Sequence, residues 1–356
     1  MAKGNFKSFL TRKNIEISGK RYGIDALGAM AQGLFASLLM GTIISTLGTQ
    51  LGIAFLVTIG NFAKSTYVVG GAMACAIAYA LKAPPLVLFS IITVGAATNE
   101  LGGAGGPLAV LITSIVATEF GKAVSKETKV DILVTPFVTI FVGVGLAMLC
   151  APYIGIGASY VGNLIMWATE LHPFFMGILV SVIVGIALTL PISSAAICHA
   201  LGLVGLAGGA AVAGCCAQMV GFAVMSFREN RWGGLVSQGI GTSMLQMGNI
   251  VKNPRIWIPP TLASAITGPI ATCVFKFKMN GAAISSGMGT CGFVGQIGVY
   301  TGWLNDIEAG LKTSVTALDW IAMILICFVL PAVLSWAFGL LLRKIGWIKE
   351  NDLKLD

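Results

Sequence analysis

The sequence has 356 residues, of which 56% are hydrophobic and only 10% are charged, with a formal net charge of +8. Soluble globular proteins carry about 25% charged residues, so this composition excludes an ordinary soluble domain and predicts an all-α polytopic integral membrane protein. The lysines and arginines lie mainly in short connections between apolar stretches, where the positive-inside rule places them. They therefore give no reason to expect a nucleic-acid partner.

The first 22 residues form a basic segment that lacks the apolar core of a signal peptide. Phe6, Leu10 and Ile15 alternate with basic residues, which is typical of an amphipathic helix on anionic lipid. A cytosolic partner is the other interpretation of this segment. The basic residues are Lys3, Lys7, Arg12, Lys13, Lys20 and Arg21.

Apolar stretches fill the chain between this segment and a charged tail at 343–356. Because a spanning helix needs about 20 apolar residues, we predict about ten transmembrane helices in a single domain over 23–342. The positive-inside rule places both termini in the cytosol. The predicted spans or half-spans are 23–47, 51–63 with an extension through 66–81, 84–95, 108–120, 132–151, 173–190, 194–227, 257–275, 281–302 and 321–342.

Two other stretches do not fit simple spans. The stretch 160–169 has the tyrosine and tryptophan of an interfacial segment. The stretch 232–251 is rich in glutamine, serine and asparagine. It fits either the membrane surface or a cavity wall, and the surface is slightly favoured.

A polar, glycine-rich break at 96–107 separates two apolar segments that are each too short to cross a membrane. Irregular backbone at membrane depth persists only where it is buried in protein or lines a wet cavity. We therefore predict a re-entrant hairpin here and a second one in the glycine-rich stretch 281–302. Paired interruptions of this kind are typical of transporter binding sites.

Eight residues of these regions are the candidate solute ligands. The Glu100 carboxylate and the Asn99 amide suit the hydroxyls of a sugar, although a glutamate at a helix end can also simply reach water. The glycine amides of the first break can bind hydroxyls or an anion, or the glycines can serve tight packing. The candidates are Asn99, Glu100, Gly102, Gly103, Gly105, His199, Thr290 and Gln296.

The candidates of the second half also have simpler interpretations. His199 follows an apolar segment and can bind a hydroxyl, relay a proton near neutral pH, or donate to a backbone carbonyl. Gln296 is the polar contact expected in the second glycine-rich stretch, with Thr290 beside it. A buried packing turn explains that stretch equally well.

No pattern in the sequence points to catalysis, a metal or a cofactor. The eight cysteines lie in apolar surroundings without metal-ligand spacing, so we interpret them as small packing residues. The glycine pattern at 287–292 follows no predicted strand and fails the context test of a dinucleotide fingerprint. We expect a transporter and not an enzyme.

Several longer motifs together resemble the orphan membrane components of the phosphotransferase system. These are EIIC-like proteins that include the perfringolysin O regulator-like proteins. The resemblance covers roughly residues 20–345. The motifs that carry it lie at 105–107, 118–122, 129–136, 191–196, 253–260 and 287–296.

The resemblance implies a sugar permease of the bacterial cytoplasmic membrane, usually dimeric, with two re-entrant hairpins around a carbohydrate site. In EIIC relatives a glutamate and a histidine contact the sugar hydroxyls, and Glu100 and His199 match those residues by type. The chain carries no EIIA or EIIB domain, so phosphoryl transfer requires separate proteins.

The sequence thus predicts a permease for a carbohydrate or a related small polar solute, working by alternating access. One alternative is a membrane sensor or regulator that binds a solute without transport. Another is an ion-coupled carrier of a small organic anion, which the glycine amides would also accommodate.

Overall fold

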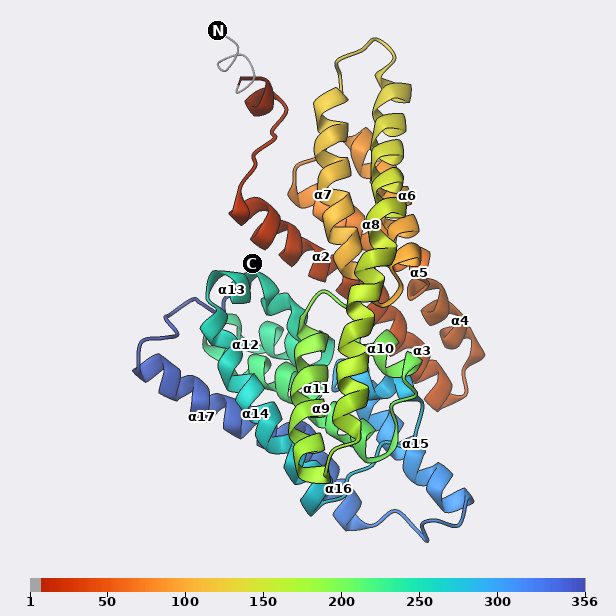
Figure 1. Ribbon diagram of the computed structural model, residues 1–356, viewed down its shortest axis with the longest axis vertical. Helices are drawn as coiled ribbons and strands as arrows, with labels where there is room; N and C mark the ends of the chain where they lie inside the picture. The colour runs from red at the N-terminus through yellow and green to blue at the C-terminus, as the bar shows by residue number, and fades with distance from the viewer. Residues whose placement is uncertain (1–7, 356) are drawn as a thin grey trace. The chain divides into compact units, whose positions relative to one another are not determined.

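The computed structural model describes residues 8–355, and these residues form helices and turns without a β-strand. The chain divides into two compact units, Met1–Gly157 and Ala158–Asp356 (Figure 1). The division falls within the long helix α8 (Asp131–Thr169). A single domain over 23–342 therefore remains a prediction.

The first unit consists of helices that follow each other closely along the chain. Residues 8–12 are helical and 15–18 are not, so the predicted amphipathic helix does not extend to Ile15, and Lys3, Phe6 and Lys7 lie outside the described residues. The elements are η1 (Arg21–Asp25), α2 (Ala26–Leu34), η2 (Phe35–Leu39), α3 (Met40–Leu51), α4 (Ala54–Ala63), α5 (Thr66–Ala80), α6 (Pro85–Gly102), η3 (Gly103–Gly105), α7 (Gly106–Val124) and the first part of α8.

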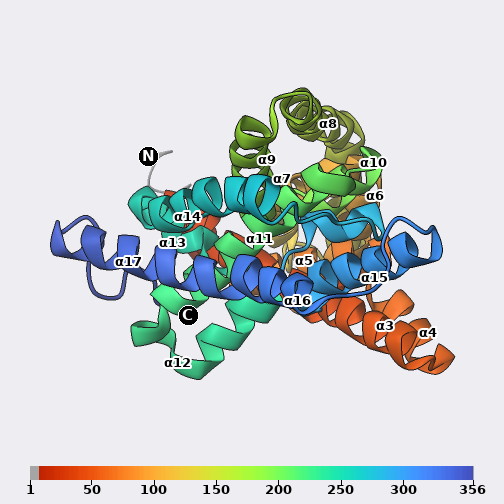
Figure 2. The same cartoon turned by 90° about the horizontal axis from the view of Figure 1, so that it is seen from below.

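Helices α3 and α4 form a tight hairpin, which Figure 2 shows side by side. Gly52 ends α3 in the left-handed conformation, with φ +68°, which glycine adopts without steric cost. A Cβ on Gly60 would lie 2.4 Å from the backbone nitrogen of Ser45, so the hairpin closes only around a glycine. The predicted extension of 51–63 through 66–81 is wrong, because α4 ends at Ala63 and Ser65 is extended.

Helices α6 and α7 pack against each other around the first glycine-rich break. They have 18 and 19 residues, or about 27 and 28 Å at 1.5 Å per residue, close to the ~30 Å of a bilayer core. The prediction of half-length helices at 84–95 and 108–120 is therefore wrong. The helices continue because Thr98 donates its hydroxyl to the Val94 carbonyl (2.7 Å) and lies 3.1 Å from the Thr113 hydroxyl.

The second unit is arranged around α11 (Gly205–Met225), which packs against α9 (Pro173–Thr189), α14 (Ile258–Pro269) and α17 (Leu330–Lys344). Figure 2 shows α14 and α17 lying beside α11. The other elements are the end of α8, α10 (Ser194–Ala200), α12 (Phe227–Val236), η4 (Ser237–Gly241), η5 (Ser243–Gln246), α13 (Met247–Lys252), η6 (Pro254–Trp257), η7 (Ile270–Val274), η8 (Ala283–Gly287), η9 (Cys291–Phe293), α15 (Val294–Glu308), α16 (Ala317–Ile324) and η10 (Leu325–Val329).

Glycines bring the neighbouring backbone into contact with α11. A Cβ on Gly214 would lie 1.9 Å from the Ser181 carbonyl oxygen, and one on Gly209 would lie 1.8 Å from that of Phe277. Small residues at such positions let membrane helices approach closely. The result is a helix that is almost entirely buried.

Two sequence expectations in the second unit change. The stretch 194–227 is broken between α10 and α11, where Gly202 and Gly205 have positive φ. The stretch 232–251 is irregular and largely buried, so it does not lie on the membrane surface as one helix. The stretch 160–169 is the end of α8 and not a separate segment, and its interfacial position stays a prediction.

Five stretches in residues 8–355 are long and apolar enough to cross a membrane. They confirm a multi-pass membrane protein, while ten crossings and two re-entrant hairpins stay predictions. The stretches are Arg21–Leu51, Pro85–Val124, Asp131–Thr169, Gly205–Met225 and Ala317–Lys344.

We predict that Gly95→Ala destabilises the first unit. Its Cβ would lie 2.2 Å from the Gly70 carbonyl oxygen, and overpacking of this kind costs about 1–3 kcal/mol. Gly145→Ala is the matched control, because nothing lies within 4 Å of its Cβ and alanine favours a helix by up to ~1 kcal/mol. Thermal unfolding followed by circular dichroism in detergent tests both. An unchanged midpoint for Gly95→Ala would contradict the α5–α6 contact.

Candidate functional site

The predicted site residues are divided between the two units. Asn99, Glu100 and the glycines at 102–105 belong to the first unit, and His199, Thr290 and Gln296 belong to the second. Each group is therefore considered within its own unit.

The first group forms a packed turn with one exposed carboxylate. Asn99 donates its side-chain amide to the Thr66 carbonyl (2.9 Å). A Cβ on Gly105 would lie 2.6 Å from the Ile154 carbonyl oxygen, and Gly103 has φ +49°. Glu100 is exposed in the last turn of α6. The glycines of the first break thus allow close packing and form the turn, which agrees with the tight-packing interpretation given for them.

In the second unit the segment around α10 and the glycine-rich stretch 281–302 contact each other directly. Ser194 donates its hydroxyl to the Gly287 carbonyl (2.8 Å), and Ser286 donates to the Leu203 carbonyl (2.5 Å). A Cβ on Gly287 would lie 2.6 Å from the Ser194 carbonyl oxygen, so no larger residue fits there. The glycine-rich stretch at 281–302 is thereby fixed to the segment around α10.

The middle of α11 contacts the glycine-rich stretch at 281–302. Cys215 approaches the Ser286 carbonyl with its sulfur (3.8 Å), and the Gln296 amide donates to the Cys216 sulfur (3.3 Å). The Thr290 hydroxyl donates to the Met219 sulfur (3.6 Å). Two of the predicted site residues, Thr290 and Gln296, therefore lie together against α11. Both are buried.

Gln296 carries an unused acceptor. Its side chain is only 7% exposed, yet its Oε1 atom finds no hydrogen-bond partner in residues 8–355. A buried acceptor without a partner costs about 1–3 kcal/mol. Such a group is explained when a ligand or a water molecule supplies the missing donor.

On another side of α11, Gln218 organises a polar network that sequence reasoning missed. Its Oε1 accepts from the Trp257 indole (2.9 Å) and the Thr189 hydroxyl (3.4 Å). Its Nε2 donates to the Thr261 hydroxyl (3.3 Å) and, at 3.5 Å, to that of Ser264. The Thr189 hydroxyl also lies 2.8 Å from that of Ser243. The network joins α9, α11 and α14 by polar contacts.

A signal for Gln218 is present in the sequence. It is the one amide side chain in the apolar stretch 205–225, and polar residues inside membrane segments are costly unless they are partnered or functional. Its partners could not be found in the same way, because they come from other helices. His199, in contrast, is exposed in the last turn of α10 and is not part of this network.

A family profile described as "Phosphotransferase system, EIIC" matches residues 24–355, nearly the whole chain. The chain belongs to this family. No match was found among curated proteins or solved structures. The predicted resemblance to EIIC proteins is thus confirmed. EIIC domains are sugar-transporting membrane components that are not catalytic on their own and work with EIIA and EIIB partners.

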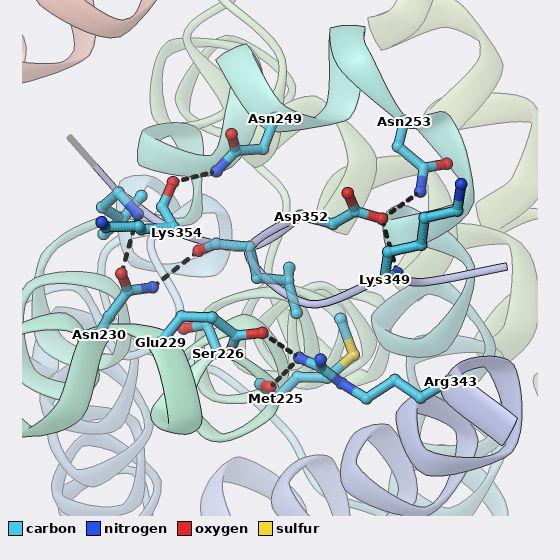
Figure 3. A network of polar contacts seen from close by, with 12 residues as sticks. Met225, Ser226, Glu229, Asn230, Asn249, Asn253, Arg343, Lys349, Asp352 and Lys354 are labelled. Carbon is cyan, nitrogen blue, oxygen red and sulfur yellow. Dashed lines mark hydrogen bonds and ion pairs between the residues drawn. The ribbon is translucent and has the colours of Figure 1, made fainter. Parts of the chain in front are cut away.

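The family match includes the C-terminal residues of this EIIC chain, which the structure shows to be docked (Figure 3). Gln246 and Asn230 donate their amides to the Leu353 carbonyl (2.9 and 2.7 Å). Asn249 donates to the Lys354 carbonyl (2.8 Å). The predicted charged tail is therefore attached to α12 and α13, and the polar stretch 232–251 supplies part of its binding site.

A buried ion pair lies beside the docked tail in Figure 3. Arg343 of α17 contacts Glu229 of α12 at 2.6 Å. The side chains are 16% and 3% exposed, so the pair has little access to water. Breaking a buried pair by removing one charge is costly, because the other charge is left unpaired.

The two glutamines of α11 and α15 should respond differently to substitution. Gln218→Met leaves the Trp257 indole without its acceptor, removes the contacts to the hydroxyls of Thr189, Thr261 and Ser264, and is expected to cost about 1–3 kcal/mol. Gln296→Met removes an unpaired acceptor and one weak bond, so it is expected to change the free energy of unfolding by less than about 1 kcal/mol. Tryptophan-fluorescence melting in detergent measures both. Equal losses would contradict the assignment of an unused acceptor to Gln296.

For the ion pair, Glu229→Gln is expected to destabilise the EIIC protein by about 2 kcal/mol or more. Glu350→Gln is the control, because Glu350 is exposed in the same tail region. Thermal melting and limited proteolysis of the tail measure the effect. If the two variants melt alike, the pair does not anchor α17 to α12.

Proposed function

We propose that this EIIC chain is a permease for a carbohydrate or a related small polar solute, which it binds at the middle of α11 in the second unit. The observation that carries the proposal is the unpartnered Oε1 atom of buried Gln296. A sugar hydroxyl would donate to this atom and remove the cost of burying it.

The surrounding backbone supports this location. Segments around α10 and η8 leave regular helical structure in a region rich in buried polar side chains. Irregular backbone at membrane depth is tolerated where protein buries it or where it lines a wet cavity. In transporters, such interruptions typically supply the solute ligands. We therefore retain the re-entrant hairpin for 281–302.

The finer parts of the proposal follow from the family and the charge pattern. We propose transport by alternating access in a homodimer of the bacterial cytoplasmic membrane, with both termini cytosolic. Separate EIIA and EIIB proteins would phosphorylate the sugar, since family members work with such partners. Lipid surrounds the exposed apolar side chains of α8, such as Phe137 and Phe141.

Within the second unit, Gln296 and Thr290 form the centre of the proposed site and His199 is secondary, whereas Asn99 and Glu100 are proposed ligands of the first unit. Glu100 and His199 are exposed within their units, so they are open to a solute. Asn99 is already bonded to the Thr66 carbonyl. The glycines at 102, 103 and 105 act through the backbone turn that they permit.

The test is ligand-dependent thermal stabilisation of the purified protein over a panel of sugars, sugar acids and small carboxylates. A ligand at about 100 times its Kd stabilises the native state by about 2.7 kcal/mol. We expect a sugar to raise the melting temperature of the wild type and of Gln50→Met, whose residue is exposed in α3. Gln296→Met is expected to lose this shift, and Glu100→Gln to weaken it.

The alternatives give other results in the same experiment and its follow-up. Stabilisation by a sugar without flux into liposomes favours a sensor or regulator. Stabilisation by carboxylates instead of sugars favours a carrier of organic anions. A sugar shift that Gln296→Met leaves unchanged would refute the site on α11.

A further inference from the structure

The first unit contains a basic cavity of about 400 Å³ that the proposed sugar site does not use. Three segments that are distant in the sequence form it. They are the N-terminal segment at 12–14, the turn at 82–84 between α5 and α6, and the end of α7 with the loop that follows it. The lining residues are Arg12, Lys13, Asn14, Lys82, Pro84, Lys122, Ser125, Lys126 and Glu127.

Positive charge dominates the lining, with five cations and one carboxylate. Glu127 accepts from Arg12 (2.8 Å) and lies 2.5 Å from the Lys13 ammonium. The hydrogen bond from Lys13, followed by the charge of Arg12, keeps the pKa of Glu127 below its usual range. Glu127 is therefore ionised at neutral pH, and it neutralises at most one of the five cations.

Not all of the cations are engaged with protein groups. Lys122 is buried and donates to the carbonyls of Asn14 (2.7 Å) and Leu81 (3.0 Å), and it pairs with Glu119 (2.8 Å). The ammonium groups of Lys82 and Lys126, in contrast, form no hydrogen bond or ion pair with residues 8–355. Asp131 accepts from the Thr135 hydroxyl and from the backbone N–H of Lys126 (both 2.6 Å). Within residues 8–355, the exposed ammonium groups of Lys82 and Lys126 thus line the cavity without a hydrogen bond or ion pair.

The backbone holds these two lysines in an unusual conformation. Lys82 has φ +57° and Lys126 has φ +60°, both in the left-handed region, as does Asn14 with φ +55°. This region costs a residue with a Cβ about 1–2 kcal/mol, and glycine or asparagine adopts it more readily. Lysine is therefore conformationally unfavourable in both turns. An anion bound by the two ammonium groups would offset this cost.

From this lining we infer that the cavity binds a phosphate-bearing anion. A guanidinium and several ammonium groups are the usual protein ligands of phosphate oxygens. The cavity lies where α5 and α7 end and α6 begins, which is the level of the lipid headgroups if these helices cross the bilayer. The phosphate can therefore come from an anionic phospholipid or from a soluble phosphate ester. This site is separate from α11, so its test does not depend on the sugar site.

The test variant is Lys82→Asn/Lys126→Asn, which removes both unpartnered charges and keeps residues that tolerate the left-handed conformation. The control is Lys276→Asn/Lys278→Asn, which removes two exposed charges outside the cavity, one of them also at a left-handed position (Lys276, φ +47°). Native mass spectrometry of the full-length protein in neutral detergent counts bound molecules. The probes are dioctanoyl phosphatidylglycerol, glycerol 1-phosphate and dioctanoylglycerol.

We expect phosphatidylglycerol to bind the wild type and the control alike, and to bind the test variant about thirtyfold more weakly, since each of the two charges contributes about 1 kcal/mol. Binding of phosphatidylglycerol without glycerol phosphate identifies a lipid site, and binding of both with similar affinity identifies a soluble phosphate ester. Equal binding to test and control variants, or binding of dioctanoylglycerol as tight as that of phosphatidylglycerol, would overturn the proposal.

A salt titration of the wild type keeps the proposal testable if the double variant does not fold. Binding of phosphatidylglycerol is expected to weaken as sodium chloride rises from 50 to 500 mM, because salt screens exposed charges. Affinity that does not change with salt would overturn the electrostatic site.

Discussion

Close approach of backbone to backbone is the constraint on which the second unit depends. Gly209 and Gly214 bring carbonyl oxygens of other segments to within 2 Å of where a side chain would begin. No other residue type would let α9 and the segment after η7 pack so closely on α11. Because α11 is held in this way, Cys215, Cys216 and Met219 meet the stretch 281–302, whereas Gln218 meets α9 and α14. The polar centre is thus a product of glycine packing.

Polar side chains inside the apolar segments fall into two classes. Those of the Gln218 network satisfy one another, and they connect helices at a depth where water would not serve them. Gln296 differs, since within residues 8–355 its Oε1 atom has no hydrogen-bond partner, as is also true of the buried hydroxyls of Ser114, Thr118 and Ser335. In a low-dielectric interior, a satisfied network stabilises one arrangement, and an unsatisfied group marks a place where something is missing. This distinction supports a solute at Gln296 and a structural role for Gln218.

The sequence predicted the membrane class and the family, since these depend on composition and local motifs. It did not predict the full length of α6 and α7. Hydropathy marks polar Thr98 as the end of a helix, whereas its hydroxyl donates to the Val94 carbonyl within α6 and lies 3.1 Å from the Thr113 hydroxyl. It also failed to find the Gln218 network, whose members lie 29 to 46 positions from Gln218. Neighbours across helices are set by packing, which no local pattern encodes.

Side-chain amides hold the docked tail by its main-chain carbonyl groups. The amides of Asn230, Gln246 and Asn249 bind carbonyls of residues 353 and 354, and carbonyls are common to every amino acid. Among the described residues after Lys344, only Ile348 and Leu353 have buried side chains, and the Asp352 carboxylate accepts from the Asn253 amide (2.8 Å). The exposed tail positions without such contacts can therefore vary, whereas the length and backbone path of the tail cannot. An attachment of this kind keeps the position of the tail while its exposed surface changes.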